Sequence, residues 1–233
     1  MAGVNMGKIK YWYNDLKEKL RPMTLKQKIS YFFTYYKGWF AGILVLILFA
    51  AYIGDFIVQR NQETILEGFF TNDDYVVFDA KNIKKEFEAL VEPGKKQNII
   101  LDEELYIATD GSARDYSAAS NGKIIAYMSV GELDFIITRR EIYEHYTGNV
   151  PMLDISSVLS PELIKKLEPY FLEGSLIDSE GKESEPYPTA IELSQCRFLR
   201  DRADVPEGPY YLFAPYQAPH HDMLRKFIEY LFD

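Results

Sequence analysis

Hydrophobic residues form one long run near the start of this chain and shorter, periodic clusters after it. The run, Gly38–Val58 (GWFAGILVLILFAAYIGDFIV), contains one charged residue, Asp55. As a helix that rises 1.5 Å per residue, about 21 residues reach roughly 31 Å, which matches the hydrocarbon core of a bilayer. We therefore predict a transmembrane helix over residues 38–59.

The segment before this run also has a helical pattern. Apolar residues from Ile9 to Leu20 recur three or four positions apart, as on one face of a helix, and Pro22 ends the pattern. Thr24 and Gln27 then match the capping box S/T-x-x-Q. This motif predicts a second helix that continues without a break into the apolar run.

Charge is divided unevenly along the chain. Residues 1–37 carry eight Lys or Arg against two acidic residues, a net charge of +6, whereas the whole chain carries −9, so the remainder carries −15. Short basic flanks stay in the cytoplasm. The sequence thus predicts a single-pass protein of the cell membrane with its N-terminus in the cytoplasm. Its parts are a cytoplasmic basic amphipathic segment (1–37), the transmembrane helix (38–59) and an extracytoplasmic domain (60–233).

A cleaved signal peptide is the alternative interpretation of the apolar run. About 37 residues precede the run and Arg60 follows it, whereas a signal peptide has a shorter apolar region close to the N-terminus. We therefore expect the run to stay in the protein and the lipid bilayer to be a partner.

From residue 65 onward, strand-like and helix-like patterns alternate. The first six elements follow the order β-α-β-α-β-α, which predicts an α/β domain with a mixed, mostly parallel sheet flanked by helices. Residues 75–78 either extend the first strand or begin the next element. Ser160 and Pro161 mark the start of a later helix that runs through Phe171. The expected strands are 65–70, 98–107, 133–138, 176–182, 188–193 and 210–215, and the expected helices are 80–91, 116–130, 140–146, 161–171 and 219–232.

The domain contains no motif that predicts catalysis. The G-x-S-x-G elbow, the P-loop, the G-x-G-x-x-G fingerprint and HExxH are all missing, so we expect no enzyme, no cofactor and no catalytic residue. His220 and His221 are adjacent, and on a helix they point about 100° apart, so we interpret them as polar residues at a helix start and not as a metal site. The acidic balance disfavours nucleic acid. Cys196 is the single cysteine and cannot form an intramolecular disulfide.

Polar residues gather where the predicted strands end. In open α/β sheets, ligands bind beyond the carboxyl ends of the strands, so these residues form a candidate site for a small ligand. The same residue types are common in turns, which is the alternative interpretation. The candidate residues are Asn72, Asp73, Asp110, Ser112, Arg114 and Thr138.

Several stretches resemble known sequences. Asn121–Met128 (NGKIIAYM) followed by Gly131–Ile137 (GELDFII) resembles the helix-then-strand "GeiDvii" passage of extracellular solute-binding proteins of the ABC-transporter type. Residues 152–160, 188–193, 210–215 and 227–231 resemble the next passage, the return strands and the closing helix of that fold. Tyr35–Trp39 (YYKGW) resembles a "YYKW"-like stretch in uncharacterised single-pass membrane proteins of low-GC Gram-positive bacteria.

The resemblance covers about two-thirds of the outer domain and implies one solute-binding lobe or a reduced pair, because a complete solute-binding protein is longer. No ligand-binding residue carries over. It implies a membrane-anchored binding or interaction module with a protein partner, accessory to a transporter or envelope complex. A single-pass envelope sensor and an envelope enzyme are the alternatives.

Overall fold

The computed structural model describes residues 3–60, 62–112, 114–147, 150–175, 184–205 and 210–233, and in the first two helices it leaves out the side chains of residues 3–10, 12, 32, 35, 36, 39, 40 and 55–60. The chain forms two compact units, Met1–Asn61 and Gln62–Asp233, which we describe separately. The strand predicted at 176–182 lies outside the described residues.

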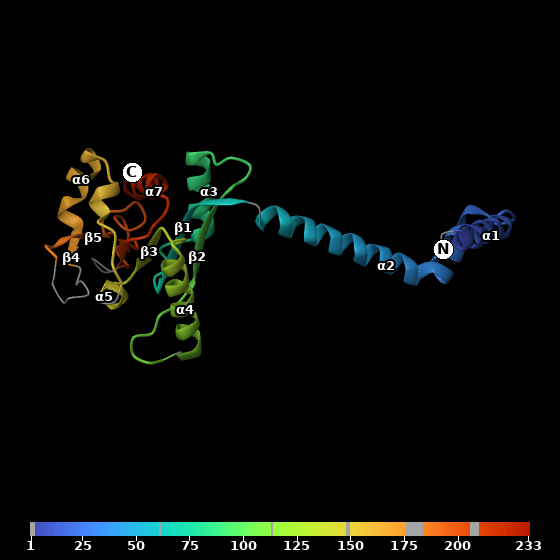
Figure 1. Cartoon of the computed structure of the whole chain (residues 1–233), viewed down its shortest axis with the longest axis horizontal. Helices are drawn as coiled ribbons and strands as arrows, with labels where there is room; N and C mark the ends of the chain where they lie inside the picture. Colours follow the sequence, from blue (N-terminus) through green and yellow to red (C-terminus); the bar gives the residue numbers. More distant parts are fainter. Residues whose placement is uncertain (1–2, 61, 113, 148–149, 176–183, 206–209) are drawn as a thin grey trace. The chain divides into compact units, whose positions relative to one another are not determined.

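The first unit consists of two helices, α1 (Gly3–Leu20) and α2 (Leu25–Arg60). Figure 1 shows α2 as one continuous helix, as the sequence predicted. The capping box is confirmed, because the backbone N–H of Thr24 donates to Gln27 Oε1 (2.9 Å) and that of Gln27 donates to Thr24 Oγ1 (3.5 Å). When only the described residues are counted, no helix is both long enough and apolar enough to cross a membrane.

The second unit is an α/β domain built on a six-stranded sheet with the order β2-β1-β3-β6-β5-β4. Strand β1 pairs in parallel with β2 and β3, whereas the β3–β6, β6–β5 and β5–β4 pairs are antiparallel. The sheet is therefore mixed, and the expectation that it would be mostly parallel is wrong for its pairings. The elements are β1 (Glu63–Thr71), α3 (Ala80–Val91), β2 (Gln97–Leu105), α4 (Arg114–Val130), β3 (Phe135–Thr138), α5 (Arg140–Thr147), the 3₁₀ helix η1 (Ile155–Val158), α6 (Pro161–Leu167), the 3₁₀ helix η2 (Glu168–Tyr170), β4 (Phe171–Gly174), β5 (Tyr187–Glu192), β6 (Tyr211–Phe213) and α7 (His221–Phe232).

Helices cover both faces of this sheet, and a hydrophobic core fills each side. One core joins the sheet to α3, α6 and α7, with Phe87, Leu163 and Phe227 among its buried residues. The other joins the sheet to α4 and α5 through residues such as Ile124 and Tyr146. Because α3 and α4 lie on opposite faces, the chain leaves β1 toward β2 on one side and returns to β3 on the other.

Two local expectations differ from the structure. The helix that Ser160 caps ends at Leu167 and not at Phe171, because Pro169 has no backbone N–H to continue the helical hydrogen bonds; the 3₁₀ helix η2 follows, and then β4. Residues 75–78 belong to no strand: Asp74 and Tyr75 form a turn, and residues 76–78 have no regular structure, with Val76 at a φ of 48°.

Other boundaries agree with the sequence. Gly131 ends α4 with a φ of 68°, and the N–H of Glu132 reaches back to the carbonyl of Tyr127 (3.1 Å), as in a glycine-capped helix end.

Candidate functional site

The carboxyl ends of β1 and β3 meet at the point where the strand order reverses. Thr71 ends β1 and Thr138 ends β3, and their hydroxyl oxygens lie 2.5 Å apart in a buried hydrogen bond. Open α/β sheets bind ligands beside such a point. The predicted residue Thr138 therefore lies at the expected edge of the sheet, with its hydroxyl bonded to Thr71.

The next predicted residues fasten loops at this edge. Asn72, which adopts a left-handed φ of 53°, donates through its amide to the carbonyl of Ile107 (2.7 Å) and accepts from the N–H of the same residue (2.9 Å). The carboxylate of Asp73 accepts from the N–H of Phe78 (2.7 Å) and from the hydroxyl of Tyr210 (2.5 Å). Burial and this bond to Asp73 raise the pKa of Tyr210 above its ordinary value. Both side chains therefore act inside the fold.

An ion pair that sequence reasoning missed completes this edge. Arg139 lies directly after β3, pairs with Asp74 at 2.6 Å, and places its guanidinium 5.4 Å from the ring centre of Tyr75. Arg202 donates to the carbonyl of Tyr75 at 3.1 Å. Arg139 could have been predicted from its position directly after the buried strand β3, because Thr138 was chosen for its position at the end of the same strand.

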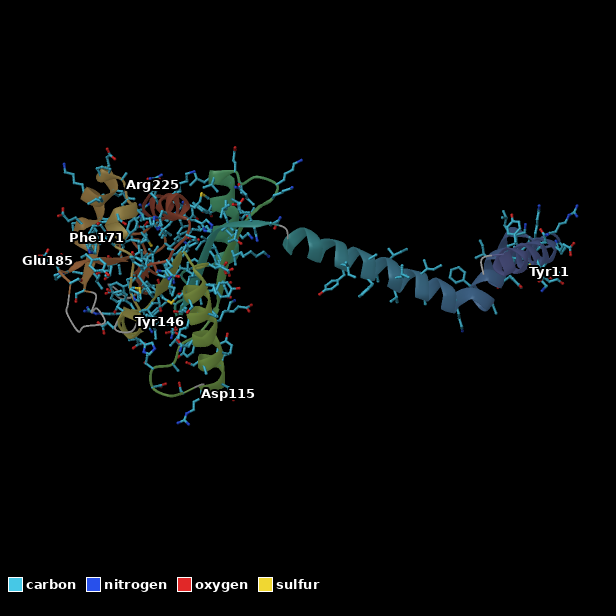
Figure 2. The ribbon with its side chains drawn as sticks, viewed as in Figure 1. Tyr11, Asp115, Tyr146, Phe171, Glu185 and Arg225 are labelled. Atoms are coloured by element: carbon cyan, nitrogen blue, oxygen red, sulfur yellow. The ribbon has the colours of Figure 1, made fainter. Side chains whose placement is uncertain are left out.

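A crevice of about 350 Å³ lies beside this edge, on the α4 and α5 face of the sheet. We call it the α4 crevice. It is open to solvent and is lined by the loop after β2, by the N-terminal turns of α4 and by His145 on α5; Figure 2 labels Asp115 at the start of α4 and Tyr146 on α5. Two predicted residues, Ser112 and Arg114, line it. The full lining is Ile107, Ala108, Thr109, Gly111, Ser112, Arg114, Ser117, Ala118, Asn121 and His145.

Side chains of α4 hold the loop that forms this crevice. Ser117 Oγ accepts from the N–H of Ala108 (2.9 Å), and Ser120 Oγ accepts from the N–H of Tyr106 (3.3 Å). Asn72 fixes Ile107 between them. Serine hydroxyls bond readily to nearby backbone groups, so the loop is fastened at three consecutive residues and the crevice is formed before any ligand arrives.

The tip of the loop is a tight turn. Asp110 Oδ1 accepts from the N–H of Ser112 (2.9 Å), and the hydrogen bonds from Ser112 lower the pKa of this exposed carboxyl. Gly111 adopts the left-handed φ of 76° that such a turn requires. Asp110, the remaining predicted residue, thus shapes the loop and does not line the crevice.

The lining favours a small ligand that accepts hydrogen bonds. Arg114 is a permanent cation, the first turn of a helix leaves N–H groups without intrahelical partners, and the lining contains no carboxylate. A volume near 350 Å³ lies at the lower end of small-molecule sites. Among the described residues, no group of three or more His, Cys, Asp or Glu is placed to hold a metal ion.

A second polar cluster lies elsewhere in the domain, around the buried Asp134. Its carboxylate accepts from the backbone N–H groups of Glu67 (2.7 Å) and His220 (2.8 Å), and His220 Nδ1 lies 2.9 Å away. Burial raises the pKa of Asp134, while its bonds with His220 and Glu67 oppose this shift. His220 precedes α7, as predicted for a polar helix start, and its partner Asp134 was not foreseen.

Glu67 itself is a buried carboxyl on the α4 face. Burial, reinforced by the charge of Glu132 and opposed by that of Lys123, raises the pKa of Glu67 to about 7. Lys123 pairs with Asp102 (2.5 Å) and lies over the ring of Phe69. The bonds of Asp134 join β1 to the start of α7, so we assign this cluster to stability.

Comparisons of this chain with protein-family models, with curated proteins and with solved structures find no match.

Proposed function

We propose that this protein is a membrane-anchored binding module whose outer α/β domain takes a small solute in the α4 crevice. The observation that carries the proposal is this crevice, which has a preformed loop and lies next to the reversal of strand order. The proposed solute is polar and carries a carboxylate or a similar anionic group, which Arg114 and the first N–H groups of α4 would receive.

The domain's overall acidity does not argue against an anionic solute. At physiological ionic strength, exposed charges are screened over about 8 Å. The groups that line the crevice therefore govern binding more than distant carboxylates do. The lining contains Arg114 and no Asp or Glu, and Asp110 and Asp115 are carboxylates next to Gly111 and Arg114 in sequence. The net negative charge would slow the approach of an anion without abolishing its binding.

The proposed anchor is the apolar run Gly38–Val58 in α2. It includes residues 39, 40 and 55–58, whose side chains lie outside the described set, so the proposal depends on the sequence. It is supported by the exposure of described apolar side chains, for example Leu46 at 68% and Phe49 at 62%. Water is an unfavourable surrounding for such a run, whereas lipid is a favourable one.

The anchor has a direct test. The full chain expressed in cells should stay with the membrane fraction after washing with alkaline carbonate and leave it only in detergent. Release by carbonate alone would refute the anchor. Protease added to intact cells should digest the outer domain and spare residues 1–37, because the basic flank is expected inside.

The crevice is tested with a steric block. Ala118 lines the crevice on α4, whereas its neighbour Ala119 is exposed and does not line it. In Ala118→Phe the ring occupies the site, and Ala119→Phe is the matched control. Thermal unfolding of the full chain in neutral-lipid nanodiscs is measured with mono-, di- and tricarboxylates and amino acids.

A true ligand at about 100 times its Kd stabilises the folded state by about 2.7 kcal/mol. For a domain of this size, that energy raises Tm by roughly 5–10 °C. We expect this rise in the wild type and in Ala119→Phe, and its loss in Ala118→Phe. If no compound in the panel raises Tm, or if both variants respond alike, the crevice is not the binding site.

A further inference from the structure

The bend between α1 and α2 contains a second hollow, in the basic N-terminal unit. Helix α1 ends at Leu20, Pro22 follows, and the capping box at Thr24 starts α2. The bend is held by backbone bonds from Arg21 N–H to the carbonyl of Lys17 (3.1 Å) and from the N–H of Met23 to that of Leu20 (3.2 Å). The bend forms an open concavity of about 770 Å³, which we call the elbow hollow.

Positive side chains gather around the elbow hollow. Lys17 lies in the last turn of α1, Arg21 directly after α1, and Lys28 in the first turns of α2. Glu18 is the one carboxylate in the lining, so the net charge of the lining is +2. Tyr13, Lys17 and Arg21 are four residues apart and follow one stripe of the helix. Tyr13 adds a hydroxyl that can donate a hydrogen bond.

Glu18 can balance only one of these three cations, so repulsion between cations remains in the hollow. Like charges four residues apart on a helix destabilise it by roughly 0.2–0.5 kcal/mol per pair. Among the described residues of α1, Lys19 forms an ion pair with Asp15 (2.8 Å), and this pair includes none of the three cations at the hollow. A bound anion would offset this repulsion.

We propose that the elbow hollow binds a phosphate group. Phosphate offers several charged acceptor oxygens in one group, which suits a guanidinium fork together with two ammonium groups better than a single carboxylate does. The phosphate can belong to the headgroup of an anionic lipid or to a soluble phosphate compound of the cytoplasm. The lipid source depends on the membrane anchor proposed above, whereas phosphate binding itself does not.

The length of α2 bears on the choice between these sources. Lys28 precedes Gly38 by ten residues, which is about 15 Å along a helix axis. The headgroup layer beyond the hydrocarbon core is only about 5–7 Å thick on each side. A helix standing upright in the bilayer would hold the hollow beyond the lipid phosphates, which favours the soluble source; a strongly tilted helix would bring lipid within reach.

The experiment compares two variants of the full chain with equal charge. Lys17→Gln/Arg21→Gln/Lys28→Gln removes the three cations of the hollow. Lys19→Gln/Lys26→Gln/Lys37→Gln removes three cations that do not line it. Binding of inorganic pyrophosphate is measured by calorimetry in nanodiscs of phosphatidylcholine, and circular dichroism checks that both variants keep the helicity of the wild type.

The wild type should bind pyrophosphate, and the hollow variant should bind it about 30-fold more weakly or worse, as expected when several charge-assisted contacts are lost. The control should lose about threefold or less, the share due to general charge. Equal losses in the two variants, or no binding to the wild type, would overturn the proposal. Failure here leaves the Ala118→Phe result untouched, so the two proposals can fail separately.

The source of the phosphate is decided by changing the lipid. Part of the phosphatidylcholine is replaced by phosphatidylglycerol in one set of nanodiscs and by oleate, an anion without phosphate, in another. If lipid headgroups occupy the hollow, phosphatidylglycerol weakens pyrophosphate binding more than oleate does. Equal effects of the two lipids assign the site to a soluble phosphate compound.

Discussion

Replacing Asp134 by alanine should destabilise the α/β domain more than any single loss of a surface charge. The carboxylate is fully buried and connects β1, β3 and the start of α7 through its bonds with Glu67 and His220. Alanine leaves two backbone N–H groups without acceptors, and each costs about 1–3 kcal/mol when buried. The imidazole of His220 is 30% exposed, so water can replace its bond at little cost.

Part of this loss in the free energy of unfolding is offset, because Asp134→Ala also removes a carboxylate whose burial is unfavourable. We therefore expect a net loss of about 3 kcal/mol. Asp134→Asn keeps one acceptor oxygen, which can still receive the N–H of Glu67, and should lose about half as much. Asp222→Ala is the control, because Asp222 is 84% exposed at the start of α7 and its pair with Arg225 contributes little.

The single cysteine provides the assay. Cys196 is fully buried, and burial raises the pKa of its thiol to about 11, so it should react only when the domain opens. The adjacent N–H of Arg197 donates to the carbonyl of Leu231 in α7 (2.8 Å), so the thiol reports the region that Asp134 holds. Maleimide labelling of the full chain in nanodiscs, in increasing urea, gives an unfolding midpoint.

With an m value of roughly 1–3 kcal/mol per molar urea, a loss of about 3 kcal/mol lowers the midpoint by about 1–3 M. The asparagine variant should fall between alanine and the wild type, and Asp222→Ala should match the wild type. If Asp134→Ala unfolds at the wild-type midpoint, the three bonds to its carboxylate do not hold the domain together.

Three further predictions use the same labelling assay. Because burial raises the pKa of Glu67 from 4.5 to about 7, the folded protein binds a proton that the unfolded chain has lost, so stability falls as pH rises from about 4.5 to 7 and is level above. Glu67→Gln should flatten this slope and add up to about 3 kcal/mol at pH 8; an unchanged slope would assign it to other groups. Gly68→Ala should cost about 3 kcal/mol or more, since its Cβ would lie 2.0 Å from Cζ of Phe135, whereas Gly122→Ala, with open space around it, should be neutral or stabilising by up to about 1 kcal/mol. The Cys196 thiol of the folded wild type should react with iodoacetamide at least about 100-fold more slowly than in urea, and comparable rates would contradict its burial.

Local signals in the sequence predicted local structure well. The spacing of Ile83 and Phe87 gave helix α3 with the bounds 80–91 that the structure has, because both residues pack into the core on one helix face. The pattern was insufficient where a single residue overruled it. Tyr170 and Phe171 continue the helical spacing of α6, but Pro169 ends the helix, so Tyr170 lies in η2 and Phe171 begins β4.

The candidate site was predictable in position but not in detail. Asn72 and Asp73 do follow the end of β1, and Thr138 is the last residue of β3, so all three lie at the carboxyl ends of strands. Their bonding partners are far away in the sequence: Thr71 and Thr138 are 67 residues apart, and Asp73 and Tyr210 are 137 apart. No pattern of spacing indicates that a polar residue will meet such a partner, so the sequence could not separate residues that bind from residues that support.

In the structure, hydrogen-bond partners distinguish side chains that support the fold from side chains that are available to a ligand. A buried polar side chain seldom remains unpaired, and one that is already satisfied has less to offer a ligand. Asn72 and Asp73 are satisfied by backbone groups and by Tyr210, so they support the fold, and Asn72 does so by fixing Ile107 in the wall of the α4 crevice. Arg114 is exposed in the crevice lining; its Nε donates to the carbonyl of Gly111 (3.3 Å), and its other guanidinium N–H groups can donate to a ligand. The proposed ligand site is therefore the α4 crevice, one loop away from the reversal of strand order, where Arg114 has N–H groups that can donate to a ligand.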